Sequence, residues 1–204
     1  EKFNYALLYE GARDVAHAVE QCQWPVDANW APFHVVIQSP AGAIIISDGS
    51  EHSYTLEEIG EDGVAFLLDV GGNDTYLIPV GANESAHNAI SVAIDLGGDD
   101  LYAYAETTPA SETPRQLADD GSDRFETGSI PEVSMGPFSR SDKSRQGAGR
   151  LGTGLLFDLG GGQDTYRSLR MSQGFACLGV GVLYDDGGAD RYECEAGCQG
   201  SALF

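Results

Sequence analysis

A short motif of the form Asp-x-Gly-Gly-x-Asp-x-Tyr recurs along this 204-residue chain and constrains its fold more than any other feature. Three full copies start at Asp69, Asp95 and Asp185, and three altered copies start at Ser47, Asp119 and Asp158. The copies follow at intervals of 22 to 27 residues, apart from one interval of 39. A second marker, Gln-Gly, keeps the same period at Gln146, Gln173 and Gln199. Two markers in phase indicate a repeat protein.

Each repeat has the composition of short strands joined by glycine turns. Apolar runs such as "AIII", "SVAI" and "GLLF" precede the motif, and an alternating piece such as "DTYLIPV" follows it. A unit of about 25 residues has no room for a ten-residue helix beside these strands and cannot bury its own apolar face. Stacked units can, so we predict an all-β fold, a parallel β-helix (β-solenoid) of about six coils with one motif per coil. A β-sandwich with irregular hairpins is the alternative.

The two ends of the chain differ from the repeats. Leu8, Ala12, Val15 and Val19 have helical spacing, which predicts a short helix over residues 3–21 that caps the open end of the stack. We therefore divide the chain into a helical cap (1–30) and a solenoid domain (31–204), with an inserted loop at about 127–147. The chain lacks an initial Met and ends within a repeat, so we expect it to be part of a longer protein.

The charge of the chain excludes some classes of partner. It has 32 acidic and 11 basic side chains, a formal net charge of −21. A nucleic-acid-binding protein needs the opposite sign, so we expect no nucleic-acid partner. There is no run of 18 apolar residues, so we expect no membrane-spanning helix. Such an excess of acids is typical of a halophilic surface, of a solvated acidic face, or of bound cations.

Stacking would arrange the motif residues in columns about 4.8 Å apart. The first acids would form one row: Asp69, Asp95, Asp119, Asp158 and Asp185. The second acids would form another: Asp74, Asp100, Asp123, Asp164 and Asp190. The aromatic residues would form a ladder of core side chains: Tyr54, Tyr76, Tyr102, Phe125, Tyr166 and Tyr192.

Two rows of carboxylates need compensation, because unit charges 5 Å apart repel by roughly 1 kcal/mol in water and about 3 kcal/mol at an effective dielectric of 20. Backbone N–H groups of Asx-turns can supply it. A hard cation such as Ca²⁺, which takes carboxylate and carbonyl oxygens, can also supply it. Both readings remain open, and the ten acids of the two rows are the candidate metal ligands.

"GGNDTY" and "GGDDLY" resemble the repeats-in-toxin motif G-G-x-G-x-D, with Gly72 on the third glycine and Asp74 on the acid. This resemblance implies calcium in stacked turns, although the period is about 26 residues instead of nine. The whole unit "QG…GVGVLYDDGGADRY" resembles long-period repeats of bacterial envelope or secreted proteins. That resemblance implies an extracellular or cell-envelope location.

These patterns favour a non-catalytic structural or binding module, a rigid acidic solenoid that acts at a surface or in a larger assembly through a protein partner or self-association. The alternative is a glycan-active β-helix enzyme, a lyase or hydrolase, that grips an anionic glycan with Arg140, Lys143 and Arg145 of the inserted loop. We find no nucleophile elbow, zinc-protease motif or phosphate loop. The four cysteines predict buried thiols or one disulfide: Cys22, Cys177, Cys194 and Cys198.

Overall fold

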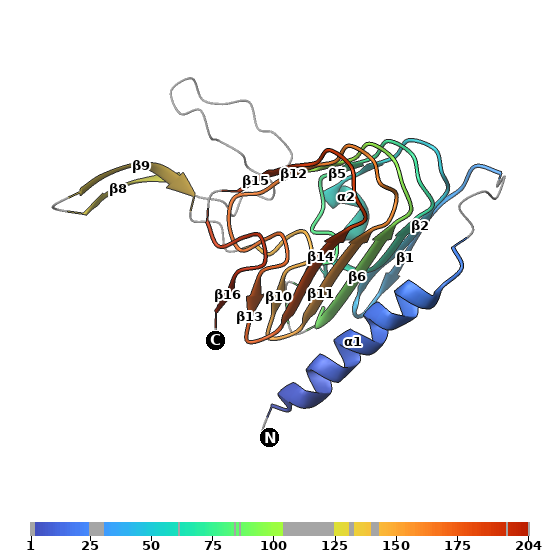
Figure 1. Ribbon diagram of the computed structural model, residues 1–204, viewed down its shortest axis with the longest axis horizontal. Helices are drawn as coiled ribbons and strands as arrows, with labels where there is room; N and C mark the ends of the chain where they lie inside the picture. The colour runs from blue at the N-terminus through green and yellow to red at the C-terminus, as the bar shows by residue number, and fades with distance from the viewer. Residues whose placement is uncertain are drawn as a thin grey trace.

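Apolar six-residue runs before each motif form the strands of the main sheet. The computed structural model describes residues 3–24, 31–60, 62–83, 85, 87–103, 125–130, 133–139, 143–194 and 196–203. Within these residues the chain is mostly β, a β-solenoid of about four turns with a short N-terminal helix (Figure 1). The strands of the main sheet, in their order across it, are β1 (His34–Ser39), β2 (Gly42–Ser47), β4 (Val64–Asp69), β6 (Ile90–Asp95), β11 (Thr153–Asp158) and β14 (Val180–Asp185).

All neighbouring strands of this sheet are parallel except β1 and β2, which pair antiparallel. A second, parallel sheet carries the aromatic position of the motif, and its strands are β3 (Ser53–Tyr54), β5 (Thr75–Tyr76), β7 (Leu101–Tyr102), β12 (Thr165–Arg167) and β15 (Arg191–Glu193). A third, parallel sheet lies in the last coils, and its strands are β10 (Gly149–Arg150), β13 (Ala176–Cys177) and β16 (Ala202–Leu203).

The predicted count of six coils is not confirmed. Strand β6 pairs directly with β11, with Asp95 opposite Asp158, so no coil is inserted between them. Asp119 and Asp123, which we had assigned to such a coil, lie outside the described residues. In the same part of the chain, β8 (Phe125–Ile130) and β9 (Val133–Ser139) form an antiparallel hairpin apart from the main sheet (Figure 1).

The predicted helix is present as α1 (Tyr5–Gln21), and the side chain of Asn4 accepts the N–H of Leu7 at its start. Its position differs from our expectation of an end cap. It lies across the outer face of the main sheet and contacts β11 and β14 (Figure 1). The edge of β2 is covered instead by β1. Among the described residues no helix is long and apolar enough to cross a membrane.

Strand alternation divides the apolar side chains between two cores. In β4 and β11, Leu67 and Leu156 point into the solenoid, where they pack with the buried tyrosines. The alternate residues Leu155 and Phe157 point outward and pack with Val19 of α1. Because side chains alternate along a strand, the acid that ends each strand, two residues after the inward leucine, also points into the solenoid.

A short helix, α2 (Leu56–Ile59), follows β3 and contributes the buried Ile59 to the inner core. One disulfide joins Cys194 and Cys198 in the last coil, in keeping with the predicted single bridge. The other two cysteines are free, with Cys22 exposed and Cys177 half-buried.

Candidate metal centre

The first acids of the motif stack in register at the ends of the parallel strands. Asp69 pairs with Asp95, Asp95 with Asp158, and Asp158 with Asp185. In Asp69, Asp95 and Asp185, one carboxylate oxygen accepts the N–H of the glycine two residues later, at 3.0, 2.7 and 2.9 Å. These are the expected Asx-turns. Backbone therefore satisfies one oxygen of each of these three acids.

The tyrosines form the predicted ladder, with Phe125 left out of it. The rings of Tyr54, Tyr76, Tyr102, Tyr166 and Tyr192 stack at centroid distances of 4.6–4.7 Å and within 7° of parallel. Tyr102 stacks directly on Tyr166, so no ring lies between them. Phe125 begins the hairpin strand β8, and its side chain lies outside the described set.

The tyrosine hydroxyls supply hydrogen bonds that the sequence analysis did not anticipate. The hydroxyl of Tyr54 donates to Oδ2 of Asp69. The hydroxyl of Tyr76 donates to Oδ2 of Asp95 and lies 3.2 Å from Oδ2 of Asp69. Tyr102 and Tyr166 both donate to Oδ2 of Asp158, at 2.9 and 2.8 Å, and Tyr192 donates to Asp185 at 2.7 Å. The aromatic ladder is thus also a ladder of donors for the first row.

The second acids link neighbouring coils. Oδ1 of Asp100 accepts the backbone N–H of Asp74 at 2.6 Å, and Oδ1 of Asp164 accepts that of Asp100 at 2.7 Å. Asp190 accepts the N–H of Asp164 in the same way at 3.1 Å. The sequence had predicted this row but not its bonding, in which each carboxylate holds the backbone of the preceding coil.

In three acids of the second row the other carboxylate oxygen has no partner. Oδ2 of Asp74, Asp100 and Asp164 is buried and makes no hydrogen bond. The three residues are 1%, 3% and 1% exposed. A buried acceptor without a partner costs about 1–3 kcal/mol, and more when it is charged. These oxygens therefore call for a proton or a cation beside them.

The two rows approach one another in three groups of carboxylates. Within each group one oxygen per residue lies within 4.8 Å of the others. The groups are Asp69, Asp74 and Asp95; Asp95, Asp100 and Asp158; and Asp164, Asp185 and Asp190. Eight of the ten predicted ligands are thus brought together, and the other two are Asp119 and Asp123, which lie outside the described residues.

Burial dominates the electrostatics of these groups. Burial, together with the charge of the neighbouring carboxylates, raises the pKa of Asp95 and Asp164 to about 7, of Asp74 to about 8 and of Asp100 to about 10. Burial likewise raises the pKa of Asp69 and Asp158, against hydrogen bonds from tyrosine that lower it. Without a compensating positive charge, the rows are forced to retain protons near neutral pH.

Glycines allow the coils to approach closely enough to form the groups. Gly98 has a φ of +147°, and a Cβ built on it would lie 1.4 Å from the carbonyl oxygen of Gly72 in the preceding coil. A Cβ built on Gly188 would likewise lie 1.7 Å from the carbonyl oxygen of Gly162. Only glycine fits these positions, which explains why the motif carries a glycine two residues before its second acid.

The first coil ends both rows without a carboxylate. Ser47 pairs with Asp69 in the sheet, and its hydroxyl lies 2.6 Å from that of Tyr54. His52 takes the place of the second acid, since its backbone N–H donates to Asp74. In the first coil both row positions therefore carry a side chain without a carboxylate.

Buried glutamines give the second marker of the sequence a structural role. Nε2 of Gln146 donates to the carbonyls of Tyr102 and Arg167, at 3.1 and 2.9 Å. Nε2 of Gln173 donates to the carbonyls of Tyr166 and Glu193, both at 3.0 Å. Each glutamine thus joins two neighbouring coils. The phase of the Gln-Gly marker was the signal for this role.

The described residues do not form the predicted glycan-binding cluster of Arg140, Lys143 and Arg145 at the surface. The backbone of Arg145 forms a β-bridge with that of Ser172 in the next coil. The residue is only 2% exposed, so its side chain is buried in the stack. Arg140 lies outside the described residues, and Lys143 is half-buried. A buried arginine cannot contact a polysaccharide at the surface.

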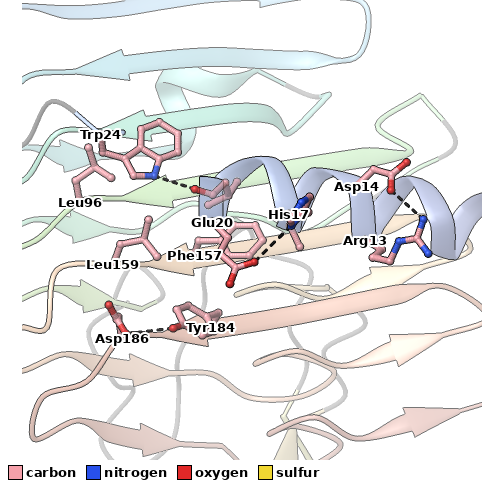
Figure 2. Close-up of a pocket in the computed structure, with 12 residues that line it drawn as sticks. Arg13, Asp14, His17, Glu20, Trp24, Leu96, Phe157, Leu159, Tyr184 and Asp186 are labelled. Atoms are coloured by element: carbon pink, nitrogen blue, oxygen red, sulfur yellow. Dashed lines mark hydrogen bonds and ion pairs between the residues drawn. The ribbon is translucent and has the colours of Figure 1, made fainter. Parts of the chain in front are cut away.

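A groove of about 890 Å³ lies between α1 and the outer face of the main sheet (Figure 2). Leu96, Phe157 and Leu159 line it on the sheet side. Figure 2 shows that its polar groups pair with each other: Arg13 with Asp14 at 3.1 Å, His17 with Glu20 at 3.5 Å and Tyr184 with Asp186 at 3.1 Å. Three of the buried oxygens without a partner belong to aspartates that lie in groups of carboxylates, and we therefore take the aspartate rows as the candidate site.

Comparison of the chain with known protein families, with curated proteins and with solved structures gave no match.

Proposed function

We propose that the chain is a non-catalytic structural or binding module, a rigid acidic β-solenoid stabilised by calcium at its stacked Asp-Gly turns. The observation that supports this most is the buried, unpartnered Oδ2 that each of the three carboxylate groups contains. A cation between the rows would satisfy these oxygens and offset the repulsion of the carboxylates together.

The donor set favours calcium. All the grouped side chains are carboxylates, the ligands that hard cations prefer. Calcium accepts six to eight oxygens at 2.3–2.6 Å in flexible geometry, whereas magnesium demands an octahedron and usually keeps several waters. The inner groups are 1–3% exposed at Asp74, Asp95 and Asp100, which suits an ion that can be held mainly by protein oxygens.

The wider role follows from the surface of the solenoid. The last coil leaves Tyr184, Tyr192 and Leu203 39–56% exposed, which suits contact with a protein partner or a further coil. Calcium is abundant outside cells, so we place the module at the cell envelope or in the extracellular space of a bacterium. The alternative of a glycan-active enzyme has less support, because Arg145 is buried.

Thermal unfolding with and without a chelator tests the proposal. Calcium at one hundred times its dissociation constant adds about 2.7 kcal/mol per site, which raises the Tm of a chain of this size by roughly 5–10 °C. We expect chelation to lower the Tm and calcium, but not magnesium, to restore it. An unchanged Tm after complete chelation would remove calcium from the proposal and leave turns held by protons and Asx hydrogen bonds.

A matched pair of variants locates the effect. Asp100→Asn changes a buried acid that belongs to a group, whereas Asp99→Asn changes its exposed neighbour, which belongs to none. We expect the first variant to lose part of the calcium-dependent rise in Tm and the second to keep all of it. Equal losses would indicate a general charge effect.

A further inference from the structure

Two of the three carboxylate groups share a residue. Asp95 belongs both to the group of Asp69 and Asp74 and to the group of Asp100 and Asp158. In the sheet Asp95 pairs with Asp69 on one side and with Asp158 on the other. Its carboxylate therefore lies between the two groups.

Hydrogen bonds fix the orientation of this shared carboxylate. Oδ1 of Asp95 accepts the N–H of Gly97 at 2.7 Å, and Oδ2 accepts the hydroxyl of Tyr76. The residue is 1% exposed. A buried carboxylate with a hydrogen bond at each oxygen cannot rotate toward one group and away from the other.

Each of the two groups contains one buried oxygen that lacks a partner. They are Oδ2 of Asp74 in the first group and Oδ2 of Asp100 in the second. In both residues the backbone N–H of the preceding coil occupies the other oxygen, at 2.6 Å in Asp100. One cation in each group would satisfy both free oxygens, whereas a single cation would leave one of them bare.

We propose that these two groups form one two-cation site bridged by Asp95, and that the group of Asp164, Asp185 and Asp190 forms a separate one-cation site. This inference rests on the proposed function. The stacked rings place neighbouring coils 4.6–4.7 Å apart, slightly more than the 3.5–4 Å between the ions of typical two-metal sites. Five carboxylates face two divalent ions, so five negative charges meet four positive ones.

The third group differs in access as well as in membership. Asp164 is 1% exposed and keeps an unpartnered Oδ2, but Asp185 and Asp190 of the last coil are partly exposed. Water can therefore reach this site directly. We expect its ion to exchange with solvent faster than the two ions in the interior.

Counting bound calcium by native mass spectrometry tests the bridge. The wild-type chain is expected to bind three calcium ions at a concentration that saturates it. At the same concentration Asp95→Asn should bind one, since it damages both inner groups. Asp69→Asn and Asp190→Asn should each bind two, because each residue belongs to one group. The control Asp99→Asn should bind three.

The outcomes separate this inference from the proposed function. A wild-type chain that binds no calcium overturns both. A wild-type chain that binds three, together with Asp95→Asn that loses a single ion, overturns only the bridge. If Asp95→Asn does not fold, Asp95→Ser replaces it, because the first coil already carries a serine, Ser47, at this position of the row. Loss of two ions from the serine variant supports the bridge, and loss of one overturns it.

Discussion

Removal of calcium should make the stability of the chain fall as the pH rises, which is unusual for an acidic protein. In an unfolded chain the pKa of aspartate is about 3.9. In the folded chain it is about 7 for Asp95 and Asp164, about 8 for Asp74 and about 10 for Asp100. Above about pH 5 the folded state without cations therefore binds more protons than the unfolded state, and the free energy of unfolding decreases as the pH rises.

The size of the effect follows from the number of protons retained. Each carboxyl that stays protonated only in the folded state removes about 1.4 kcal/mol per pH unit. Two such carboxyls would remove roughly 5 kcal/mol between about pH 5 and pH 7. A domain has about 5–15 kcal/mol in total. The chelated protein should thus be close to unfolding at mildly alkaline pH.

Urea unfolding followed by circular dichroism, at about pH 5, 6, 7 and 8 with chelator or with calcium, measures this slope. With calcium the carboxylates are ionised in both states above about pH 6, so the slope should nearly vanish. Asp164→Asn should reduce the chelated slope by about 1.4 kcal/mol per pH unit up to about pH 6 and by about half of that at pH 7, because the pKa of Asp164 is about 7. Asp99→Asn should leave the slope unchanged. A chelated stability that rises or stays flat between these pH values would refute the reasoning.

Three further substitutions test the parts of the stack. Tyr76→Phe removes the hydroxyl that donates to Asp95 and should cost about 1.5–3 kcal/mol in urea unfolding. Tyr192→Phe removes the bond to Asp185 at a 39% exposed ring and should cost less than about 1.5 kcal/mol. Gly98→Ala should lower the Tm far more than Gly187→Ala. Both glycines have a positive φ, but an added Cβ meets a carbonyl oxygen of the neighbouring coil only at Gly98. Equal shifts in Tm would contradict this contact between coils. Gln173→Ala removes two hydrogen bonds to the carbonyls of Tyr166 and Glu193 and should cost about 1–3 kcal/mol. Gln199→Ala, in the exposed last coil with the same positive φ, should change stability by less than about 0.5 kcal/mol.

The period of the motif was enough to predict which acids stack, because a parallel coil places equivalent residues opposite one another. Asp69, Asp95, Asp158 and Asp185 pair in the predicted order. The motif letters alone were not enough at Asp119. The residues before it, "TPRQLA", lack the apolar run that forms a main-sheet strand in the other coils. A turn motif that no apolar run precedes does not predict a main-sheet strand, and β6 pairs directly with β11.

The chemistry between the rows could be predicted only in part. The spacing of seven residues from Asp69 to Tyr76 and from Asp95 to Tyr102 was visible, but the direction of each hydroxyl depends on how the strand alternates after the turn. The hydrogen bond from each second acid to the preceding coil depends on the exact distance between the two coils, which gives one carboxylate oxygen a donor and leaves the other without one. The period of the sequence does not determine that distance, so it left protons and cations as equal alternatives.

The residues at the two ends of the rows show how the charge of the stacked carboxylates is limited. At the first-coil end of the first row the carboxylate is replaced by Ser47, which is 0% exposed and uncharged and whose hydroxyl lies 2.6 Å from that of Tyr54. Where the described row ends in the last coil, Asp185 and Asp190 are kept, but they are partly exposed to water. In the sheet Ser47 lies between Asp69 and His34, so a carboxylate at this position would be buried with another carboxylate on one side only. The first coil instead carries its buried acid at Asp48, where hydrogen bonds from Ser50 and Phe33 lower the pKa to about 2. A buried acid outside the rows is thus kept charged by its own donors, whereas the acids within the rows need an ion or a proton between them.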